Sequence, residues 1–177
     1  MKPLFLFMIV LFVHGKVESQ SSPCGSDPVY RQFDFWLGSW EAFGPKGQKA
    51  GHSKVSLILD SCIVLEEWTS ATMQRNVRFQ GKSFNTYNAQ TKQWQQTWVD
   101  NTGSTTHYLK GRAETNKIIF ETVPSPDPHD TTGTSRLSFF KLDEDKVRQL
   151  GELSKDNGKT WTTQYDLEYR RKKTADR

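Results

Sequence analysis

The sequence has few of the residues that build metal centres and none of the common catalytic motifs. Its 177 residues include two cysteines and four histidines, and two cysteines alone cannot make a structural zinc site. There is no G-x-S-x-G elbow, no H-E-x-x-H and no phosphate-binding loop. A haem protein would need an axial ligand such as an inward histidine, and His107 is the sole candidate in an expected strand. We therefore expect no metal site and no cofactor.

Long apolar runs are also scarce. The longest, residues 4–13 (LFLFMIVLFV), follows Lys2 and is too short to span a bilayer core of roughly 30 Å. A basic residue, an apolar segment of this length and a small residue beyond it are typical of a secretory signal. We predict a signal peptide over residues 1–19, cleaved after Ser19, with Gly15 as the alternative end. The mature protein is then expected to be secreted or periplasmic, with no integral membrane segment.

Export changes the interpretation of the two cysteines. Cys24 and Cys62 form the only available pair, and an even number of cysteines in an oxidising compartment favours a disulfide. Such a bond would stabilise the fold by about 3 to 4 kcal/mol on the chain-entropy account. We expect it to tie an N-terminal arm, residues 20–32, to a strand.

Beyond the leader, apolar and polar residues alternate in steps of two, the period of a β-strand. In residues 161–169, one face carries Trp161, Tyr165 and Tyr169, and the other is polar. Residues 93–100 alternate in the same way. Turn signals separate further β-rich runs, at 54–60, 62–69, 82–88, 105–111, 117–123, 136–142 and 146–153.

Short sequential strands without a long helix between them favour a closed barrel, because closure removes exposed sheet edges. We predict an all-β fold, a single antiparallel up-and-down barrel of about 8 to 10 strands, over residues 33–172. Ser26-Asp27-Pro28 offers a helix cap with proline at the first helical position. The short helical turn that follows is expected to plug one barrel end, and residues 173–177 form a basic tail.

Residues 154–161 read SKDNGKTW, which matches the S-x-D-x-G-x-T-W pattern that recurs in sialidases. Ser154 and Asp156 can hydrogen-bond the backbone of a turn, Gly158 can take a positive φ, and Trp161 can fold back under the hairpin. A propeller needs at least four blades of roughly 40 to 50 residues, which this chain cannot supply. We interpret the octet as a structural turn and not as a sialidase signature.

Gly38-Ser39-Trp40 is similar to the G-x-W signature that opens lipocalin barrels, with Arg170 as the candidate partner of the tryptophan. Longer strings resemble an exported, lipocalin-like (calycin-type) barrel family that is described mainly as a domain of unknown function and found chiefly in bacteria. The resemblance implies a calycin-type barrel with a small-molecule pocket, and it assigns no catalytic residue. One departure is Asn157, where glycine is usual. The strings are FDFWLGSWEAF (33–43), CIVLEEW (62–68), SFNTYN (83–88), QWQQTWVDNTG (93–103), VRQLGELSKDNGKTW (147–161) and YDLEYRRK (165–172).

The inward strand faces would bring aromatic and polar side chains to one interior, as in typical ligand pockets. Two alternatives stay open. The same residues could fill the core of a surface or interaction protein, or an inward carboxylate could serve a barrel isomerase, cyclase or hydrolase. Export argues against a nucleic-acid partner, and the sequence leaves the oligomeric state open. The candidate ligand-binding residues are Glu66, Trp68, Asn85, Tyr87, Gln96, Trp98, Asp100 and Tyr165.

Overall fold

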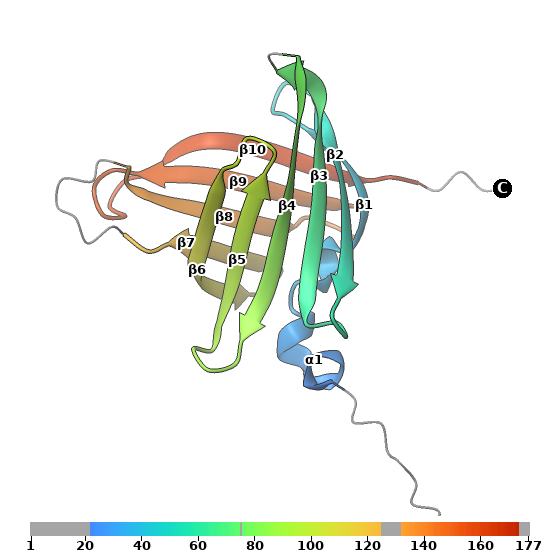
Figure 1. Ribbon diagram of the computed structural model, residues 1–177, viewed down its shortest axis with the longest axis vertical. Coiled ribbons are helices and arrows are strands. Elements are labelled where there is room, and N and C mark those ends of the chain that lie inside the picture. Colours follow the sequence, from blue (N-terminus) through green and yellow to red (C-terminus); the bar gives the residue numbers. More distant parts are fainter. Residues whose placement is uncertain (1–21, 75, 125–131, 174–177) are drawn as a thin grey trace, which may run out of the picture.

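The computed structural model describes residues 22–74, 76–124 and 132–173, which form a closed antiparallel β-barrel of ten strands (Figure 1). Each strand pairs with its neighbours in the chain, and β1 pairs with β10 to close the barrel. The predicted all-β, up-and-down architecture is therefore confirmed. The predicted signal peptide, residues 1–19, lies outside the described residues. The strands are β1 (Gly38–Phe43), β2 (Lys49–Ile58), β3 (Ile63–Gln74), β4 (Val77–Asn88), β5 (Gln93–Asp100), β6 (Thr105–Glu114), β7 (Lys117–Thr122), β8 (Thr134–Lys141), β9 (Lys146–Ser154) and β10 (Thr162–Arg171).

The period-two alternation sets which side chains face the interior. In β5, Trp94 and Gln96 are each 2% exposed, in agreement with the predicted inward face. In β10 the register shifts between Thr163 and Tyr165, and Trp161 lies before the strand begins. The inward face that we predicted from Trp161 to Tyr169 therefore holds only from Tyr165 onward.

The N-terminal arm closes one end of the barrel. It forms a short helix α1 (Pro23–Ser26) and two 3-10 turns, η1 (Pro28–Arg31) and η2 (Asp34–Trp36). Asp27 caps η1, because its Oδ1 accepts the Val29 amide hydrogen at 3.0 Å. Phe33 and Trp36 are completely buried and pack on aromatic side chains of β7 and β8. The arm thus fills the barrel end beside which α1 lies (Figure 1).

A disulfide joins Cys24 in α1 to Cys62, which immediately precedes β3, so the predicted bond is confirmed. Beside it, the Arg31 guanidinium donates a hydrogen bond to the Ser61 carbonyl oxygen at 2.5 Å. The arm is therefore fastened to the barrel by a covalent bond as well as by packing.

The arginine that stacks on Trp40 is Arg171, so the predicted partner, Arg170, is wrong by one residue. The Arg171 guanidinium lies 4.2 Å from the centre of the Trp40 ring and donates to the Leu37 carbonyl oxygen at 2.9 Å. Arg170 instead covers the ring of Phe43. The pairing of β1 with β10 places Trp40 opposite Arg171, and directly paired residues of two strands share a face.

The octet SKDNGKTW forms the turn between β9 and β10. Ser154 Oγ donates to Asp156 Oδ1 at 2.8 Å and accepts the Gly158 amide hydrogen at 2.8 Å. Hydrogen bonds from Thr160, and then from Ser154, lower the pKa of Asp156 to about 2. Asn157 takes a φ of 57°, a conformation that asparagine tolerates better than most residues. Trp161 folds back and donates from Nε1 to the Gly158 carbonyl oxygen at 3.1 Å.

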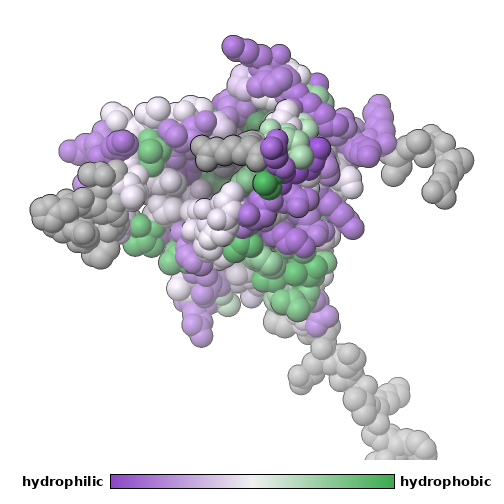
Figure 2. Space-filling model, turned by 45° about the horizontal axis from the view of Figure 1, so that its top comes forward, coloured by the Kyte–Doolittle hydropathy of each residue, from purple (hydrophilic) through white to green (hydrophobic). Residues whose placement is uncertain are grey.

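On the face that Figure 2 shows, most of the surface is hydrophilic, and the largest hydrophobic area lies near the start of the described chain. Leu59, in the turn after β2, is 72% exposed with a φ of 49°, although we expected it to continue the apolar face of its strand. Within the described ranges, no helix is both long enough and apolar enough to cross a membrane.

Candidate functional site

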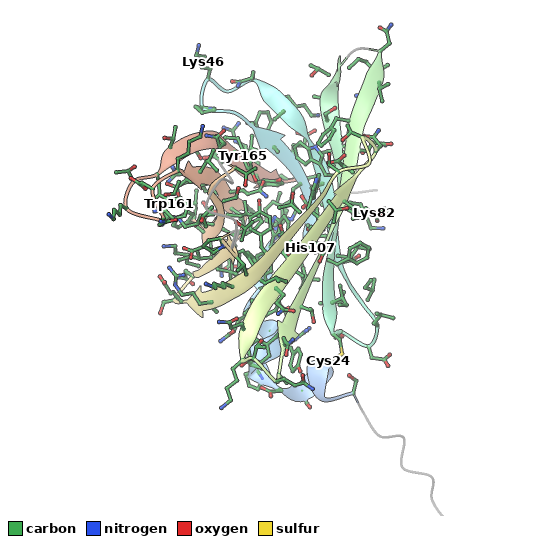
Figure 3. The ribbon with its side chains drawn as sticks, turned by 60° about the vertical axis from the view of Figure 1, so that its left-hand side comes forward. Cys24, Lys46, Lys82, His107, Trp161 and Tyr165 are labelled. Carbon is green, nitrogen blue, oxygen red and sulfur yellow. A yellow bond between two sulfur atoms is a disulfide. The ribbon has the colours of Figure 1, made fainter. Side chains whose placement is uncertain are left out.

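The barrel end opposite the N-terminal arm contains a cavity of about 380 Å³. Tyr165, one of its lining residues, lies near this end and far from Cys24 (Figure 3). The barrel interior is thus filled at one end by the arm and hollow at the other. Six aromatic side chains contribute to the wall of the cavity, namely Trp68, Phe79, Trp98, Tyr108, Tyr165 and Tyr169.

Three of these rings lie flat against the wall because glycines on neighbouring strands leave room for them. A Cβ atom added to any of the three glycines would collide with the ring that covers it. Glycine within a strand commonly marks such a close approach, and an aromatic ring across it restores the lost packing. The glycines let these rings pack close to the barrel wall, so the rings leave the cavity open. The pairs are Trp68 over Gly51, Trp98 over Gly81 and Tyr165 over Gly151.

Glu66 of β3 contributes a carboxyl group to the inner part of the cavity. Its side chain lines the cavity yet is only 2% exposed. Ser53 donates to Glu66 Oε1 at 2.9 Å and Ser83 donates to Oε2 at 3.1 Å. Burial raises the pKa of Glu66 to about 7, and these hydrogen bonds offset only part of the effect.

A chain of amide groups fixes the orientation of Gln96. Asn85 donates from Nδ2 to the Val64 carbonyl oxygen at 2.8 Å, and a backbone carbonyl only accepts. Asn85 Oδ1 must then face Gln96, which donates to it from Nε2 at 2.7 Å. Gln96 Oε1 consequently points away from Asn85, and it has no hydrogen-bond partner within the described part of the chain. An amide acceptor is therefore available on a side chain that lines the cavity.

Tyr169 and Tyr165 of β10 complete the polar part of the wall. The Tyr169 hydroxyl donates to Gln149 Oε1 at 2.8 Å and lies 3.5 Å from Glu66 Oε1. Burial, and then the charge of Glu66, raise the pKa of Tyr169. Burial also raises the pKa of Tyr165, which lines the same cavity, while 41% of the residue's surface is exposed.

The structure brings five of the eight candidate ligand-binding residues together as lining of the cavity. They are Glu66, Trp68, Gln96, Trp98 and Tyr165. A sixth, Asn85, is fully buried behind Gln96 and acts on the cavity only through that side chain.

The other two, Tyr87 and Asp100, do not reach this cavity. Tyr87 lies at the plugged end, with its ring centre 5.5 Å from that of Tyr30. Asp100 turns into the loop after β5, where Oδ1 accepts the Thr102 amide hydrogen at 2.9 Å. Burial acts to raise the pKa of Asp100, but hydrogen bonds from Thr102, Trp98 and Ser104 lower it overall. Asp100 therefore has a structural role at the cavity rim: it stabilises the turn after β5 and accepts a hydrogen bond from Trp98 Nε1 at 3.1 Å.

The lining residues that the candidate set missed include Phe79, Tyr108 and Gln149. Phe79 lies before the predicted start of its strand at residue 82, because β4 begins at Val77. Tyr108 and Gln149 lie in predicted strands, and only the closure of the barrel identifies their inward faces. The exposed histidine beside Tyr108, His107, contacts Thr97 on the outside.

The described residues contain no group of three or more histidine, cysteine, aspartate or glutamate side chains that could hold a metal ion.

Comparison with protein families gives one match. Residues 35–171 match the family described as "Protein of unknown function (DUF1579)", a range that begins within η2 and ends with the last residue of β10. A comparison with curated proteins finds no match. The family match therefore covers the whole barrel, including every residue that lines the cavity.

Proposed function

Because the chain belongs to the DUF1579 family of proteins of unknown function, we propose its function from the barrel itself: it binds a small, partly aromatic and partly polar molecule in the open half of the barrel. The observation that carries this proposal is the cavity of about 380 Å³ with aromatic walls and a few buried polar groups. Small-molecule sites have this size and composition.

The walls are suited to a fixed, flat ligand. Trp68 and Trp98 are held against Gly51 and Gly81, and Asp100 anchors the Trp98 indole nitrogen at 3.1 Å. Side chains that are ordered before binding lose little conformational entropy when a ligand arrives. The polar end of the ligand would meet Glu66 and Gln96, where its hydrogen bonds would fix the orientation.

The test is native mass spectrometry of the oxidised, secreted protein, followed by denaturation and extraction of released molecules. We expect a co-purifying molecule that is lost from Trp98→Ala and from Gln96→Ala. The matched control is Trp161→Ala, which removes a tryptophan at the β9–β10 turn, outside the cavity lining. A bare polypeptide mass, together with no tryptophan-fluorescence response to a panel of small aromatic compounds, would contradict the proposal.

We further propose that the protein is exported to an oxidising compartment. The Cys24–Cys62 disulfide supports this, since such bonds persist outside reducing cytosol. N-terminal sequencing of the protein recovered from culture medium or periplasm should begin after Ser19 or after Gly15. Recovery of the uncleaved chain from the cytosol would contradict it.

A second candidate function is enzymatic, and Glu66 is the observation that favours it. A pKa of about 7 suits a group that must both accept and donate a proton near neutral pH. The extracted molecule would be incubated with fresh protein and with Glu66→Gln. Conversion to an isomeric or hydrolysed product by the wild-type protein alone would identify a barrel enzyme, and unchanged ligand with both proteins would leave binding as the function.

A further inference from the structure

The charge of the cavity wall restricts the kind of ligand. Among the residues that the structure describes, the lining side chains include the carboxyl group of Glu66 and no lysine, arginine or histidine. Arg78, near the rim, is held by the carbonyl oxygens of Ser70 and Ala71 at 2.8 and 3.0 Å and does not line the cavity. An anionic ligand would therefore be placed beside a carboxyl group without a counter-ion, which is costly in a buried site.

Both oxygens of the Glu66 carboxyl group accept a hydrogen bond from a serine. Asn85 donates from Nδ2 to Ser83 Oγ at 3.0 Å, so the Ser83 hydroxyl hydrogen is directed to Glu66 Oε2 at 3.1 Å. Ser53 donates to the other oxygen, Oε1, at 2.9 Å. Both oxygens of Glu66 are therefore acceptors, and hydrogen bonds of this kind favour the carboxylate form.

Two acceptor groups are therefore offered to a ligand. The Glu66 carboxylate, once deprotonated, and Gln96 Oε1 belong to side chains that both line the cavity. Within the described residues, the hydrogen-bond partners of Glu66 are two serines and a tyrosine, and none of them carries a positive charge. A buried carboxylate without a counter-ion is stabilised most by a ligand that brings one.

The aromatic walls favour the same charge. Trp68, Trp98 and Tyr165 border the cavity with their rings, and aromatic faces attract cations, tryptophan most strongly. The π-faces, the carboxyl group and the amide oxygen all favour a hydrogen-bond donor that carries positive charge.

We propose that the ligand is a protonated amine on a small apolar or aromatic body, with its N–H groups bonded to Glu66 and Gln96 and its cation beside the tryptophan rings. This inference rests on the proposed function and names the chemical class of its ligand. Binding requires the carboxylate form of Glu66. If the carboxyl group is protonated before binding, the amine displaces that proton and one proton leaves to solvent.

The pH dependence follows from the groups around Glu66. The titratable side chains that face it are Tyr108 on β6 and Tyr165 and Tyr169 on β10, and each has a raised pKa, so none ionises near neutrality. Ser53 on β2 and Ser83 on β4 do not titrate there. A primary amine stays protonated in this range, as lysine does with a pKa of about 10.4. Amine affinity should therefore rise with pH up to about 7 and level off above it.

The experiment uses three probes of one shape and different charge: tryptamine (cation), tryptophol (neutral) and indole-3-propionate (anion). Isothermal titration of the oxidised mature protein at about pH 8 should give at least tenfold tighter binding for tryptamine than for tryptophol, and the weakest binding for the anion. In Glu66→Gln the tryptamine preference should disappear. The control is Glu67→Gln, which alters the next residue on the outer face, where it pairs with Lys82 at 2.8 Å.

A second measurement avoids any folding defect of a variant. For the wild-type protein, tryptamine affinity should fall by up to tenfold per pH unit below about pH 7, while tryptophol affinity stays level. Equal affinity for tryptophol and tryptamine, or a tryptamine preference that survives in Glu66→Gln, would overturn the amine proposal and leave small-molecule binding intact. Failure of all three indoles to bind at millimolar concentration would count against both proposals.

Discussion

Replacing Glu66 with glutamine should change the pH dependence of stability in a defined direction. The folded state raises the pKa of this carboxyl from an ordinary 4.5 to about 7, so it holds the proton more tightly than the unfolded chain does. The stability associated with protonated Glu66 is fully present below about pH 4.5 and is lost as the pH rises through about 7. Glutamine has the same shape and no charge, so it removes this loss.

The magnitude follows from the shift. One pKa unit corresponds to about 1.4 kcal/mol, so a shift from 4.5 to about 7 corresponds to about 3 kcal/mol. The free energy of unfolding of Glu66→Gln, minus that of the wild type, should therefore increase by about 3 kcal/mol between about pH 4.5 and about pH 8. Other titrating groups affect both proteins alike and cancel from the difference.

The assay is urea unfolding of the oxidised protein, followed by tryptophan fluorescence and circular dichroism at a series of pH values, with coincident transitions as the check of two-state behaviour. The matched control is Glu67→Gln. Lys82 lowers the pKa of Glu67, so the stability due to that pair is lost only on acidification, and its difference curve should be flat above about pH 5. A flat curve for Glu66→Gln as well would refute the buried-carboxyl interpretation.

Three further predictions concern the fold. Trp36→Ala should lower the free energy of unfolding by about 3 to 5 kcal/mol in chemical denaturation, because the indole is fully buried in the plug; Leu59→Ala, at a site 72% exposed, should stay within about 0.5 kcal/mol, and equal effects would contradict the plug. Reduction of the disulfide, which spans 38 residues, should cost about 3 to 4 kcal/mol, and a smaller loss would show that packing alone holds the arm. Gly81→Ala should destabilise by about 1 to 3 kcal/mol through collision with Trp98; this cost should disappear in a Trp98→Ala background, and additivity in the double-mutant cycle would refute the contact.

Much of the fold can be predicted from the sequence because its signals are local. The Asp27-Pro28 pair specifies a helix start through one side chain and one fixed backbone angle. In β5 the alternation correctly places Trp94, Gln96 and Trp98 on one face. Neither signal depends on distant parts of the chain.

The site is less predictable, because the alternation shows which side chains share a strand face but not which part of the barrel each of them contacts. Asp100 continues the inward face of β5 by alternation, yet its carboxylate bonds into the following turn. Tyr87 shares the inward face of β4 but lies at the plugged end. The error between Arg170 and Arg171 has the same origin, since the register of β1 on β10 decides which arginine faces Trp40.

The sequence by itself determined the strands, the turns, the capped arm and the cysteine pair, since each depends on residues close together in the chain or on the only available partner. Tertiary structure decided the strand register, the depth to which Phe33 and Trp36 enter the barrel, and the contacts of Tyr169 with Glu66 and Gln149. Those features depend on barrel closure, which brings Glu66 of β3 across the interior from Tyr169 of β10 and leaves one half of the barrel filled and the other hollow.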